Sequence, residues 1–413
     1  MSTVPLPQPA TAVPAAASQR SLPRGPVLDW SSFTQGEPSA LSSVVELRHT
    51  ALVTSGRAAI YQALRALHLA PGSTVLVPSY HCPTMVAPVV VAGLHARFFG
   101  LRLDGLPDLD RIDPECAALA KAMIVSHYFG RSQSLAEVRQ WCDQRGIALI
   151  EDCAHCFFGQ AGDRPIGAWG DYATASLTKF FPVPEGGLLA SNTRALPALA
   201  LAPPSLKAQL KGWLDVLELA SQHHRLAGLG HLMRPLFRLK NVRRAPPSAP
   251  SARAGAPTPD TMLADSDMAR VAQAPLWATR VLSALPRARM VAQRRQNFAT
   301  YARHFEAVPG ARPLFALGKP ASTPAAPYVY ALWVDDADRV YQALREQHLP
   351  VFRWDRIWPG TPTLAGDQGP LWSRHVLQLL CHQDLSEADV VYTSRAILAL
   401  LTVPANAPSA AGP

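Results

Sequence analysis

The stretch "TVLVPSYHCPTMVAPVVVAGLHARFFGL" (residues 74–101) contains the pattern that decides the fold. Its apolar run at 74–80 is typical of a buried strand, and the longer apolar segment at 83–93, closed by Gly93, is typical of a helix. A second short apolar run follows at 96–101. The order strand, helix, strand predicts a parallel sheet whose neighbouring strands are joined by crossing helices.

The same alternation continues on both sides of this stretch. A helical pattern at 57–69 ends at Pro71-Gly72, and another covers 134–146. Further short apolar runs, each typical of a strand, lie at 122–130, 147–153, 172–177 and 186–191. We therefore predict an α/β fold with a mainly parallel central sheet flanked by helices.

Three polar clusters follow predicted strands of this sheet: "SHYFG", "EDCAH" and "SLTK". In open parallel sheets, ligands bind beyond the carboxyl ends of the strands. The three clusters are therefore expected to meet at one edge of the sheet and to form the functional site there.

Composition shifts divide the chain into four parts. We expect a flexible Pro/Ala-rich tail at 1–40, a large domain at 41–199 with part of 263–300, and a smaller C-terminal α/β domain at 300–413. Residues 200–262 read as a basic helical insertion followed by a Pro-rich linker. A packed insertion with a solvated basic face is the favoured interpretation. Contact of 205–244 with an acidic partner or a membrane surface is the alternative.

Charge and hydropathy exclude several classes of protein. Hydrophobic residues make up 48% of the 413 residues, enough for a sizeable core, and the net charge of +9 comes mostly from dispersed arginines. Basic and aromatic residues do not interleave, which argues against nucleic-acid binding. The longest apolar run, 85–94, is about half of the ~20 residues that a transmembrane helix needs. With no secretory signal and six scattered cysteines, the default expectation is a cytoplasmic protein.

Lys179, in "TASLTKFFPVPEGGLL" (174–189), is the first candidate for a chemical role. It is one of only six lysines and lies in an apolar setting just past a strand. Desolvation lowers the pKa of a lysine, and an imine-forming lysine needs this. Taken alone, a lysine that extends to solvent from a strand end is the simpler interpretation.

Two other features give Lys179 a context. Ser55-Gly56-Arg57 begins a helix, where backbone N–H groups, a hydroxyl and a guanidinium would suit a phosphate, although an ordinary helix cap is the simpler interpretation of this turn alone. Asp152 ends an apolar strand, where a carboxylate is costly unless something cationic meets it, such as a protonated pyridine nitrogen. Together the three features describe a site for pyridoxal 5′-phosphate.

At this point the chain resembles the DegT/DnrJ/EryC1/StrS family, sugar aminotransferases of the fold type I pyridoxal-phosphate enzymes. The segments that carry the resemblance occur in the family's order over about 50–192: "TSGRAA", "VLVPSYHCPT", "AMIVSHYFG", "LIEDCAH" and "IGAWGDYATASLTKFFPVPEGGLL". "LREQHLPV" and "LSEADVVYTSRAIL" resemble the family's small domain more weakly. The resemblance implies a fold type I enzyme that acts as a homodimer.

The resemblance also implies a role for each matching residue. Lys179 is expected to bind the cofactor covalently and, once released by substrate, to move the proton during transamination. Asp152 is expected to hold the proton on the pyridine nitrogen. The residues expected to bind the phosphate are Ser55, Gly56, Arg57 and Ser176.

Other positions match the family less closely. His155 stands where the family often has glutamine near the cofactor's 3-oxygen, and imidazole can make a similar hydrogen bond. The family's stacking aromatic falls at Cys82, so Tyr80 or His81 is expected to stack on the cofactor instead. Glu185, in the acidic-Gly-Gly turn, is expected to shape the substrate side. The family's Asn-Tyr-Arg segment is not found, and "LADSDMARVAQAPL" (263–276) is its degraded equivalent by position.

The resemblance implies transfer of an amino group from an amino acid, glutamate or glutamine, to a keto-sugar, nucleotide-linked by analogy. Relatives with histidine in place of the lysine dehydrate their substrates, so Lys179 favours transamination. A pyridoxal-phosphate enzyme of another type, such as a lyase or a non-sugar aminotransferase, is the alternative. The acceptor, the donor, the stereochemistry and the pathway are not encoded in any motif.

A different class of protein is suggested by "ALIEDCAHCFFG" (148–159), whose Cys153 and Cys156 raise the question of a metal or redox site. Zinc sites usually take four ligands in two spaced pairs, and no second pair has matching spacing here. A redox Cys-x-x-Cys begins a helix, whereas this pair follows a strand. We therefore expect no metal, and expect the two cysteines to be packing residues.

Overall fold

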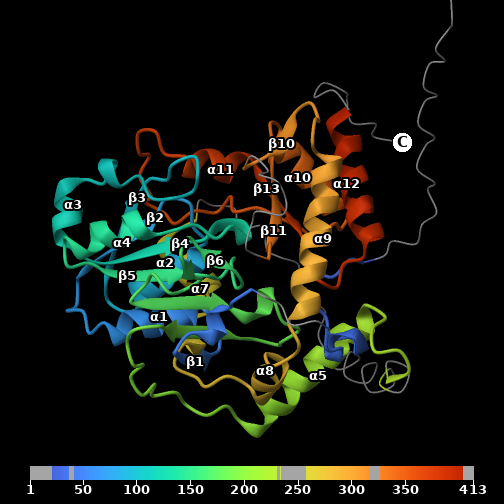
Figure 1. Cartoon of the computed structure of the whole chain (residues 1–413), viewed down its shortest axis with the longest axis horizontal. Coiled ribbons are helices and arrows are strands. Elements are labelled where there is room, and N and C mark those ends of the chain that lie inside the picture. The colour runs from blue at the N-terminus through green and yellow to red at the C-terminus, as the bar shows by residue number, and fades with distance from the viewer. Residues whose placement is uncertain (1–20, 37–40, 230–232, 234–256, 316–325, 403–413) are drawn as a thin grey trace, which may run out of the picture.

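The computed structural model of the chain describes residues 21–36, 41–229, 233, 257–315 and 326–402 (Figure 1). Its largest sheet has seven strands in the order β1-β9-β8-β5-β4-β2-β3. In chain order, the bounds of these strands are β1 His49–Val53, β2 Thr74–Pro78, β3 His95–Phe99, β4 Ala120–Ser126, β5 Ala148–Asp152, β8 Tyr172–Ser176 and β9 Gly187–Ser191.

Five neighbouring strands, β8, β5, β4, β2 and β3, run parallel, which confirms the predicted α/β class. Strand β9 pairs antiparallel with β8, and β1 pairs antiparallel with β9. The link from β8 to β9 is too short for the crossover that a parallel pair requires, so the chain turns back directly.

Alternate residues of the central strands pack on opposite faces of this sheet, as the period of two requires. Val75 and Val77 join the apolar cluster under α1 (Gly56–Ala66) and α2 (Pro83–Val91). Leu76 instead belongs to the cluster on the other face, which includes Val138 of α4 (Ala136–Asp143). Both faces are therefore covered, and the strand ends remain free for a site.

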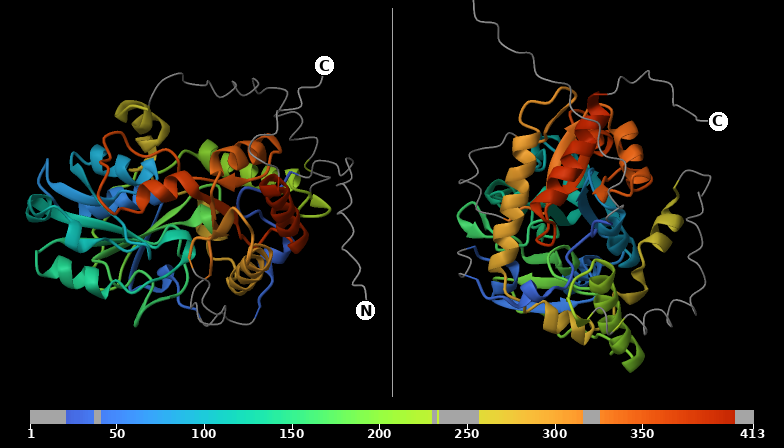
Figure 2. Two further views of the ribbon diagram at one scale, coloured as in Figure 1. Left: turned by 90° about the horizontal axis from the view of Figure 1, so that it is seen from above. Right: turned by 90° about the vertical axis from the view of Figure 1, so that its right-hand side faces the viewer.

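A second, smaller sheet follows in the C-terminal part of the chain, in the order β10-β11-β13-β12, with every pair antiparallel. Helices α9 and α12 lie side by side against it (Figure 2). The bounds of these elements are β10 Ala311–Pro313, β11 Val329–Val334, β12 Val351–Phe352, β13 Val376–Leu380, α9 Ala288–His304, α10 Ala337–Glu346 and α12 Glu387–Thr402.

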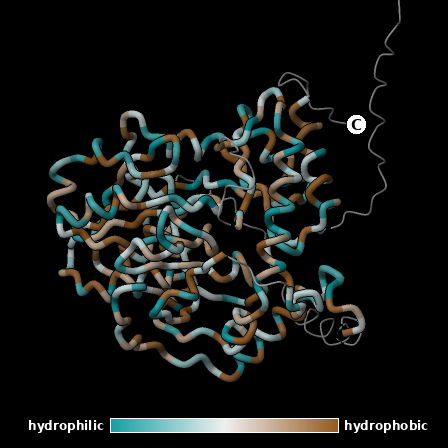
Figure 3. The backbone as a smooth tube through the Cα atoms, viewed as in Figure 1, coloured by the Kyte–Doolittle hydropathy of each residue, from teal (hydrophilic) through white to brown (hydrophobic). Residues whose placement is uncertain are grey.

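The remaining elements are short, except for one helix. They are α3 Pro114–Leu119, α5 Leu206–Gln222, α7 Pro259–Asp265, α8 Trp277–Leu282, α11 Gly369–His375 and a two-stranded sheet of β6 (Gln160–Ala161) and β7 (Arg164–Pro165). Along the peripheral helices, apolar and polar residues alternate (Figure 3). No helix among the described residues is long and apolar enough to cross a membrane.

Two predicted segments coincide only partly with the described residues. Most of the predicted Pro-rich linker lies outside the described residues. The same holds for most of the 205–244 stretch that follows α5, and for residues 1–20 of the predicted tail. Residues 21–36, also part of that tail, are packed: Val27 and Leu28 are buried, and the backbone N–H of Val27 donates to Asp384 Oδ2 at 3.0 Å. Their apolar side chains explain why this part is ordered, because their burial excludes apolar surface from water.

Candidate active site

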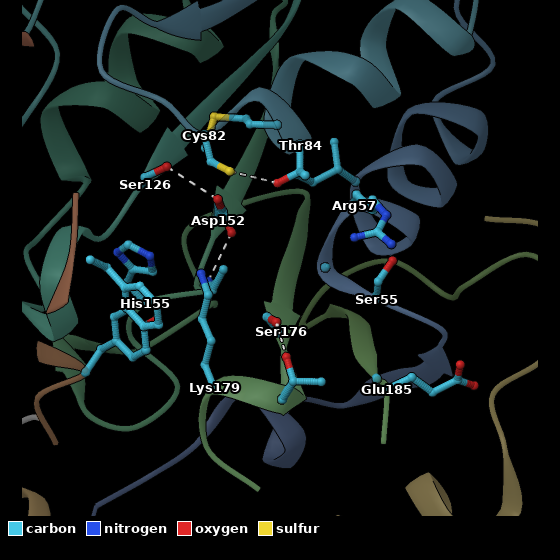
Figure 4. A pocket seen from close by; sticks show the side chains of 18 of the residues that line it. Ser55, Arg57, Cys82, Thr84, Ser126, Asp152, His155, Ser176, Lys179 and Glu185 are labelled. Atoms are coloured by element: carbon cyan, nitrogen blue, oxygen red, sulfur yellow. Dashed lines mark hydrogen bonds between the residues drawn. The ribbon is translucent and has the colours of Figure 1, made fainter. Parts of the chain in front are cut away.

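A cavity of about 550 Å³ opens where β4, β5 and β8 end and α1 begins (Figure 4). Its walls also include residues from the second sheet, which closes the opposite side. Most of the residues predicted for the site line it: Ser55, Gly56, Arg57, Asp152, His155, Ser176 and Lys179. The polar clusters predicted to converge at the strand ends therefore do meet there.

Lys179 ends the 3₁₀ turn η5 (Leu177–Lys179) that follows β8, and its side chain points into the cavity (Figure 4). Burial lowers the pKa of its ammonium, and the nearby carboxylate of Asp152 only partly opposes this. Its Nζ lies 5.2 Å from the ring centre of Tyr328. An amine whose pKa is lowered is neutral more often, and the neutral form is the nucleophile.

Asp152, the last residue of β5, is buried with 7% of its surface exposed. Its Oδ1 accepts from the backbone N–H of Ala154 at 3.0 Å and from Thr174 Oγ1 at 3.4 Å, and its Oδ2 accepts from Ser126 Oγ at 3.4 Å. Burial raises its pKa, which the charge of Lys179 counteracts. All three of these hydrogen-bond donors are neutral, so the carboxylate can still form an ion pair with a cationic group in the cavity.

The N-terminus of α1 forms one end of the cavity. Ser55 is its N-cap and accepts from the backbone N–H of Ala58 at 3.2 Å, and Ser176 Oγ lies beside it, 3.3 Å from Thr178 Oγ1. Arg57 also lines the cavity, while its guanidinium pairs with Asp267 at 2.9 Å. Free backbone N–H groups, two hydroxyls and a guanidinium together suit the dianion of a phosphate.

Gly187, the first residue of β9, allows α1 to approach the sheet this closely. A Cβ added at Gly187 would lie 2.0 Å from the carbonyl oxygen of Ser55 and 2.8 Å from the nitrogen of Gly56. Backbone cannot give way as a flexible side chain can, so any larger residue must displace the start of α1.

We expect Gly187→Ala to weaken binding of pyridoxal phosphate by about 10-fold or more, because the added methyl shifts the N–H groups at the start of α1. Fluorescence titration of the cofactor-free protein measures this affinity. Gly25→Ala is the matched control, since its added Cβ would make an ordinary 3.8 Å contact with the carbonyl of Thr178. Equal affinities for the two variants would contradict the assigned role of this close approach.

His155 is buried beside the cavity, with its ring centre 4.5 Å from that of Tyr328 and 4.7 Å from that of Trp354. Burial, with a smaller contribution from the charge of Lys179, lowers its pKa well below the usual value, so the ring is neutral. The backbone N–H of Phe129 donates to Nδ1 at 3.4 Å. The ring proton is thereby assigned to Nε2, which is left as a donor.

Tyr80 and His81, either of which was expected to stack on the cofactor, do not line the cavity. The ring of Tyr80 packs among other aromatic rings, including that of Trp372 at 5.5 Å. His81 stacks on Phe98 at 5.2 Å, and its Nε2 accepts from the backbone N–H of Trp358. The structure therefore corrects the expectation for both residues: their side chains are buried in packing contacts.

Cys82 and Thr84 line the cavity from this loop instead, and Thr84 Oγ1 donates to Cys82 Sγ at 3.1 Å. Cys82 is the N-cap position of α2, which Pro83 begins, and this turn directs its side chain toward Asp152 (Figure 4). A thiol therefore stands at the wall where an aromatic ring was expected.

Several residues that line the cavity were not predicted. Tyr328, Trp354 and Gln378 come from the second sheet and its loops, about 150–200 residues away from Lys179 in sequence. No local sequence motif indicates that these three residues belong to the site, because only the packing of the second sheet brings them to the cavity. Thr178 and Ser126, which flank predicted residues, could have been found from the strand ends alone.

The segment 263–276, which was expected to be equivalent to the family's Asn-Tyr-Arg sequence, contributes two charged residues to the cavity: Asp267 and Arg270. Asp267 pairs with Arg57, and Arg270 pairs with Glu185. Glu185 also accepts from the backbone N–H of Leu276 at 3.0 Å. The acidic-Gly-Gly turn and this segment therefore form one charged rim.

Cys153 and Cys156 are buried, and burial raises the pKa of both thiols. Neither faces a second pair of ligands; the one group of possible metal ligands among the described residues is His127, Glu151 and Cys153. Both carboxylate oxygens of Glu151 already have hydrogen-bond partners within the protein. They accept from the backbone N–H groups of Gly167, Trp169 and Gly170, and Oε1 also lies 2.8 Å from His127 Nε2.

This buried network stabilises the loop 166–170. We expect Glu151→Ala to lower the free energy of unfolding by about 3 kcal/mol or more, since three backbone donors lose their acceptor. Denaturant unfolding of the cofactor-free variant measures the loss. The exposed Glu137→Ala, which breaks only a surface pair with Arg102, is the control. If added zinc stabilised the wild type but not Glu151→Ala, the structural role would be wrong.

Comparisons with known proteins agree with this geometry. Residues 33–203 match the sequence model of the DegT/DnrJ/EryC1/StrS aminotransferase family. GDP-perosamine synthase of Vibrio cholerae is 26% identical over 178 residues, 42% of this chain and 48% of that protein. UDP-N-acetyl-3-dehydro-alpha-D-glucosamine 3-aminotransferase of Acidithiobacillus ferrooxidans is 26% identical over 219 residues, 49% of this chain and 55% of that protein. The chain thus spans about half the length of these relatives.

The similarity in structure extends further than the similarity in sequence. The aminotransferase TlmJ from Streptoalloteichus hindustanus superposes with a TM-score of 0.54 over 86% of this chain and 87% of its own, at 19% identity. At this identity the comparison shows a shared fold. It covers 86% of the chain, whereas the family's sequence model matches only residues 33–203.

Proposed function

Because residues 33–203 belong to the DegT/DnrJ/EryC1/StrS aminotransferase family, we propose that this protein is a pyridoxal-phosphate-dependent aminotransferase. It transfers an amino group from an amino acid, glutamate or glutamine, to a keto-sugar that is nucleotide-linked. The observation that carries the proposal is the joint placement of Lys179, Asp152 and the N-terminus of α1 in one cavity.

The residues present fit the cofactor at both of its ends. At one end, a buried carboxylate with only neutral hydrogen-bond donors, Asp152, can accept a proton-bearing pyridine nitrogen. At the other end, the turn at Ser55 and Gly56 with Ser176 offers N–H and O–H donors to a phosphate. Lys179 lines the same cavity, and His155 offers Nε2–H from another wall.

When bound, pyridoxal phosphate supplies an electron sink that makes the α-proton of the substrate more acidic. The protein's residues then hold and move protons. Asp152 keeps the proton on the pyridine nitrogen, because an anion there favours the charged form of the ring. Lys179, whose amine burial keeps neutral more often, would act as the base that removes the substrate's α-proton and, once protonated, would give the proton back.

The proposed acceptor rests on the relatives, whose names state a GDP-linked and a UDP-linked sugar. The charged rim of the cavity supports it, since Arg57 and Arg270 lie near the mouth, where a diphosphate would need cations. Their pairing with Asp267 and Glu185 means that an anionic substrate must compete with these carboxylates.

A second candidate keeps the cofactor and changes the reaction: a lyase or a non-sugar aminotransferase. Two features of the cavity support this second candidate. Cys82 lies at the wall where an aromatic residue was expected, and Asp267 and Arg270 add charges to the lining. Both features change the shape of the substrate side and leave Lys179 and Asp152 in place.

Incubation of the cofactor-loaded protein with glutamate, and separately with glutamine, separates an aminotransferase from a lyase. An aminotransferase converts bound pyridoxal phosphate to pyridoxamine phosphate, which absorbance and chromatography of the released cofactor detect. Conversion with either donor is the expected result. No conversion with any amino donor, in protein that contains the cofactor, would show that the reaction is of another type.

We also propose that the protein is a homodimer in the cytoplasm. Exposed apolar side chains on two helices in contact support the dimer: Trp277 and Val281 on α8, each 57% exposed, and Leu206 and Leu210 on α5. The six cysteines are all free, as in a reducing compartment. Light scattering of the purified protein tests the dimer, and a monomer at micromolar concentration would exclude it.

The division into domains is likewise proposed. We propose a large domain at 41–199 with part of 263–300 and a smaller one at 300–413. This is supported by the strands of the seven-stranded sheet, which lie between His49 and Ser191, and by those of the four-stranded sheet, which lie between Ala311 and Leu380. Helix α5 of the predicted 200–262 insertion packs against α8, where the backbone N–H of Trp277 donates to Gln209 Oε1 at 2.8 Å. This contact supports the packed interpretation of the insertion.

A further inference from the structure

Arg294 of α9 is a fully buried cation that the proposed chemistry does not use. Its side chain has 0% exposure, and its guanidinium lies 4.5 Å above the centre of the Phe180 ring. Burial lowers its pKa to about 10, so it still carries a charge at neutral pH. Among the described residues, no ion pair includes Arg294.

Within the described part of the chain, its hydrogen bonds go to neutral oxygens from three distant segments. Nη2 donates to the carbonyl of Lys179 at 2.6 Å, Nη1 to the carbonyl of Pro327 at 3.2 Å, and Nε to Gln383 Oε1 at 3.1 Å. Gln383 in turn donates to the carbonyl of Phe180 at 2.8 Å. One guanidinium therefore ties the turn that carries Lys179 to the second sheet.

Pro327 precedes Tyr328, whose ring centre lies 5.2 Å from Lys179 Nζ and 4.5 Å from the ring centre of His155. By holding the carbonyls of Lys179 and Pro327 at once, Arg294 sets the position of the lysine relative to this ring. Burying a charge without a counter-ion is costly, and an apolar side chain of similar size would be cheaper there. Such a residue is retained where its fixed geometry is needed.

We propose that Arg294 is a positioning residue that holds the backbone of Lys179 against the second sheet, so that Nζ is kept buried and directed into the cavity. Its planar fork reaches three acceptors that diverge, which a lysine ammonium cannot do. The proposal rests on the proposed function for its relevance to the reaction, but its geometric content concerns Lys179 alone.

Asn297 provides a matched control for this role. It lies one turn further along α9, is also fully buried, and its side-chain amide donates to the carbonyls of Cys381, His382 and Leu385. It secures the same region of the second sheet without touching the turn that carries Lys179. Asn297→Ala therefore reproduces a structural loss without the proposed loss of position.

The test compares wild type, Arg294→Met, Arg294→Lys and Asn297→Ala in cofactor-free form. Trace acetylation with acetic anhydride over a pH series, followed by peptide mass mapping, gives the pH midpoint at which Lys179 becomes reactive, with exposed Lys207 as internal standard. We expect Arg294→Met to raise this midpoint by about one pH unit or more, because a released turn lets water reach Nζ. Arg294→Lys is expected to be shifted in the same direction, and Asn297→Ala to keep the wild-type midpoint.

A wild-type midpoint in both Arg294 variants, or an equal shift in Asn297→Ala, would overturn the proposal. If Arg294→Met does not fold, Arg294→Lys decides by the same criterion, since it keeps the charge and removes the fork. Borohydride trapping of pyridoxal phosphate on wild-type Lys179 is measured in parallel. A midpoint shift without trapping contradicts the proposed function and supports the role of Arg294; trapping without a shift does the reverse.

Discussion

Lys179→Ala is expected to lower the rate of amino transfer by about 10⁴-fold or more, because the variant loses both the amine that binds the cofactor and the base that moves the proton. The structure supports this through burial, which lowers the pKa of Lys179, and through the cavity that Lys179 shares with Asp152 and the start of α1. Single-turnover absorbance of the cofactor-loaded protein with glutamate measures the rate.

Lys121→Ala is the control, since Lys121 is an exposed residue of β4 and should leave the rate unchanged. Borohydride reduction and peptide mapping complete the test: the phosphopyridoxyl group is expected on Lys179 in the wild type. An adduct on another lysine, or an unmodified Lys179 in freshly loaded protein, would disprove the central assignment.

Asp152→Asn is expected to have two opposite effects. In the loaded enzyme it lowers the rate by about 10²–10³-fold, because a neutral amide no longer stabilises the protonated pyridine nitrogen. In the cofactor-free protein it raises stability at neutral pH. The folded-state pKa of Asp152 is above its unfolded value, so its ionisation opposes folding as pH rises through that range, and asparagine removes this cost.

Thermal unfolding from pH 4 to 8 and the single-turnover rate check the two effects separately. The difference in melting temperature between variant and wild type is expected to grow with pH in the cofactor-free protein and to reverse when the cofactor is added. Asp171→Asn serves as the contrast: Asp171 pairs with Arg139 and Arg194, and its pKa is lowered, so this substitution should destabilise the protein above the acid range. A loss of stability in cofactor-free Asp152→Asn would contradict the conclusion that burial raises the pKa of Asp152 in the folded protein.

Much of the fold could be predicted because it is encoded in short-range periodicity. The run at 74–101 becomes β2, α2 and β3, and the period of two along β2 places Val75 and Leu76 on opposite faces. The direction of β9 could not be predicted, since an apolar run does not show whether its strand runs parallel or antiparallel to its neighbour. The antiparallel direction follows from the short connection between β8 and β9.

The candidate site shows the same division. Asp152, Lys179 and Ser55 were found because each ends or begins an element that its own neighbours define. Tyr80 and His81 were placed wrongly: the side chains in this loop are distributed by the start of α2 and by packing against Trp372 and Trp358. Neither partner is near in sequence, so no local pattern could have shown that Cys82 would face the cavity.

The sequence by itself determined the parallel sheet, the three polar strand ends and the chemistry of their side chains, because helices and strands follow from the spacing of apolar residues. Only the tertiary structure decided which residues enclose the site from the other side. Tyr328 and Trp354 line it from the second sheet and its loops, where β11 pairs with β13, and the packing of α9 brings the buried Arg294 to the backbone carbonyl of Lys179. Such long-range contacts depend on the free energy of the whole packed chain, and no single segment carries them.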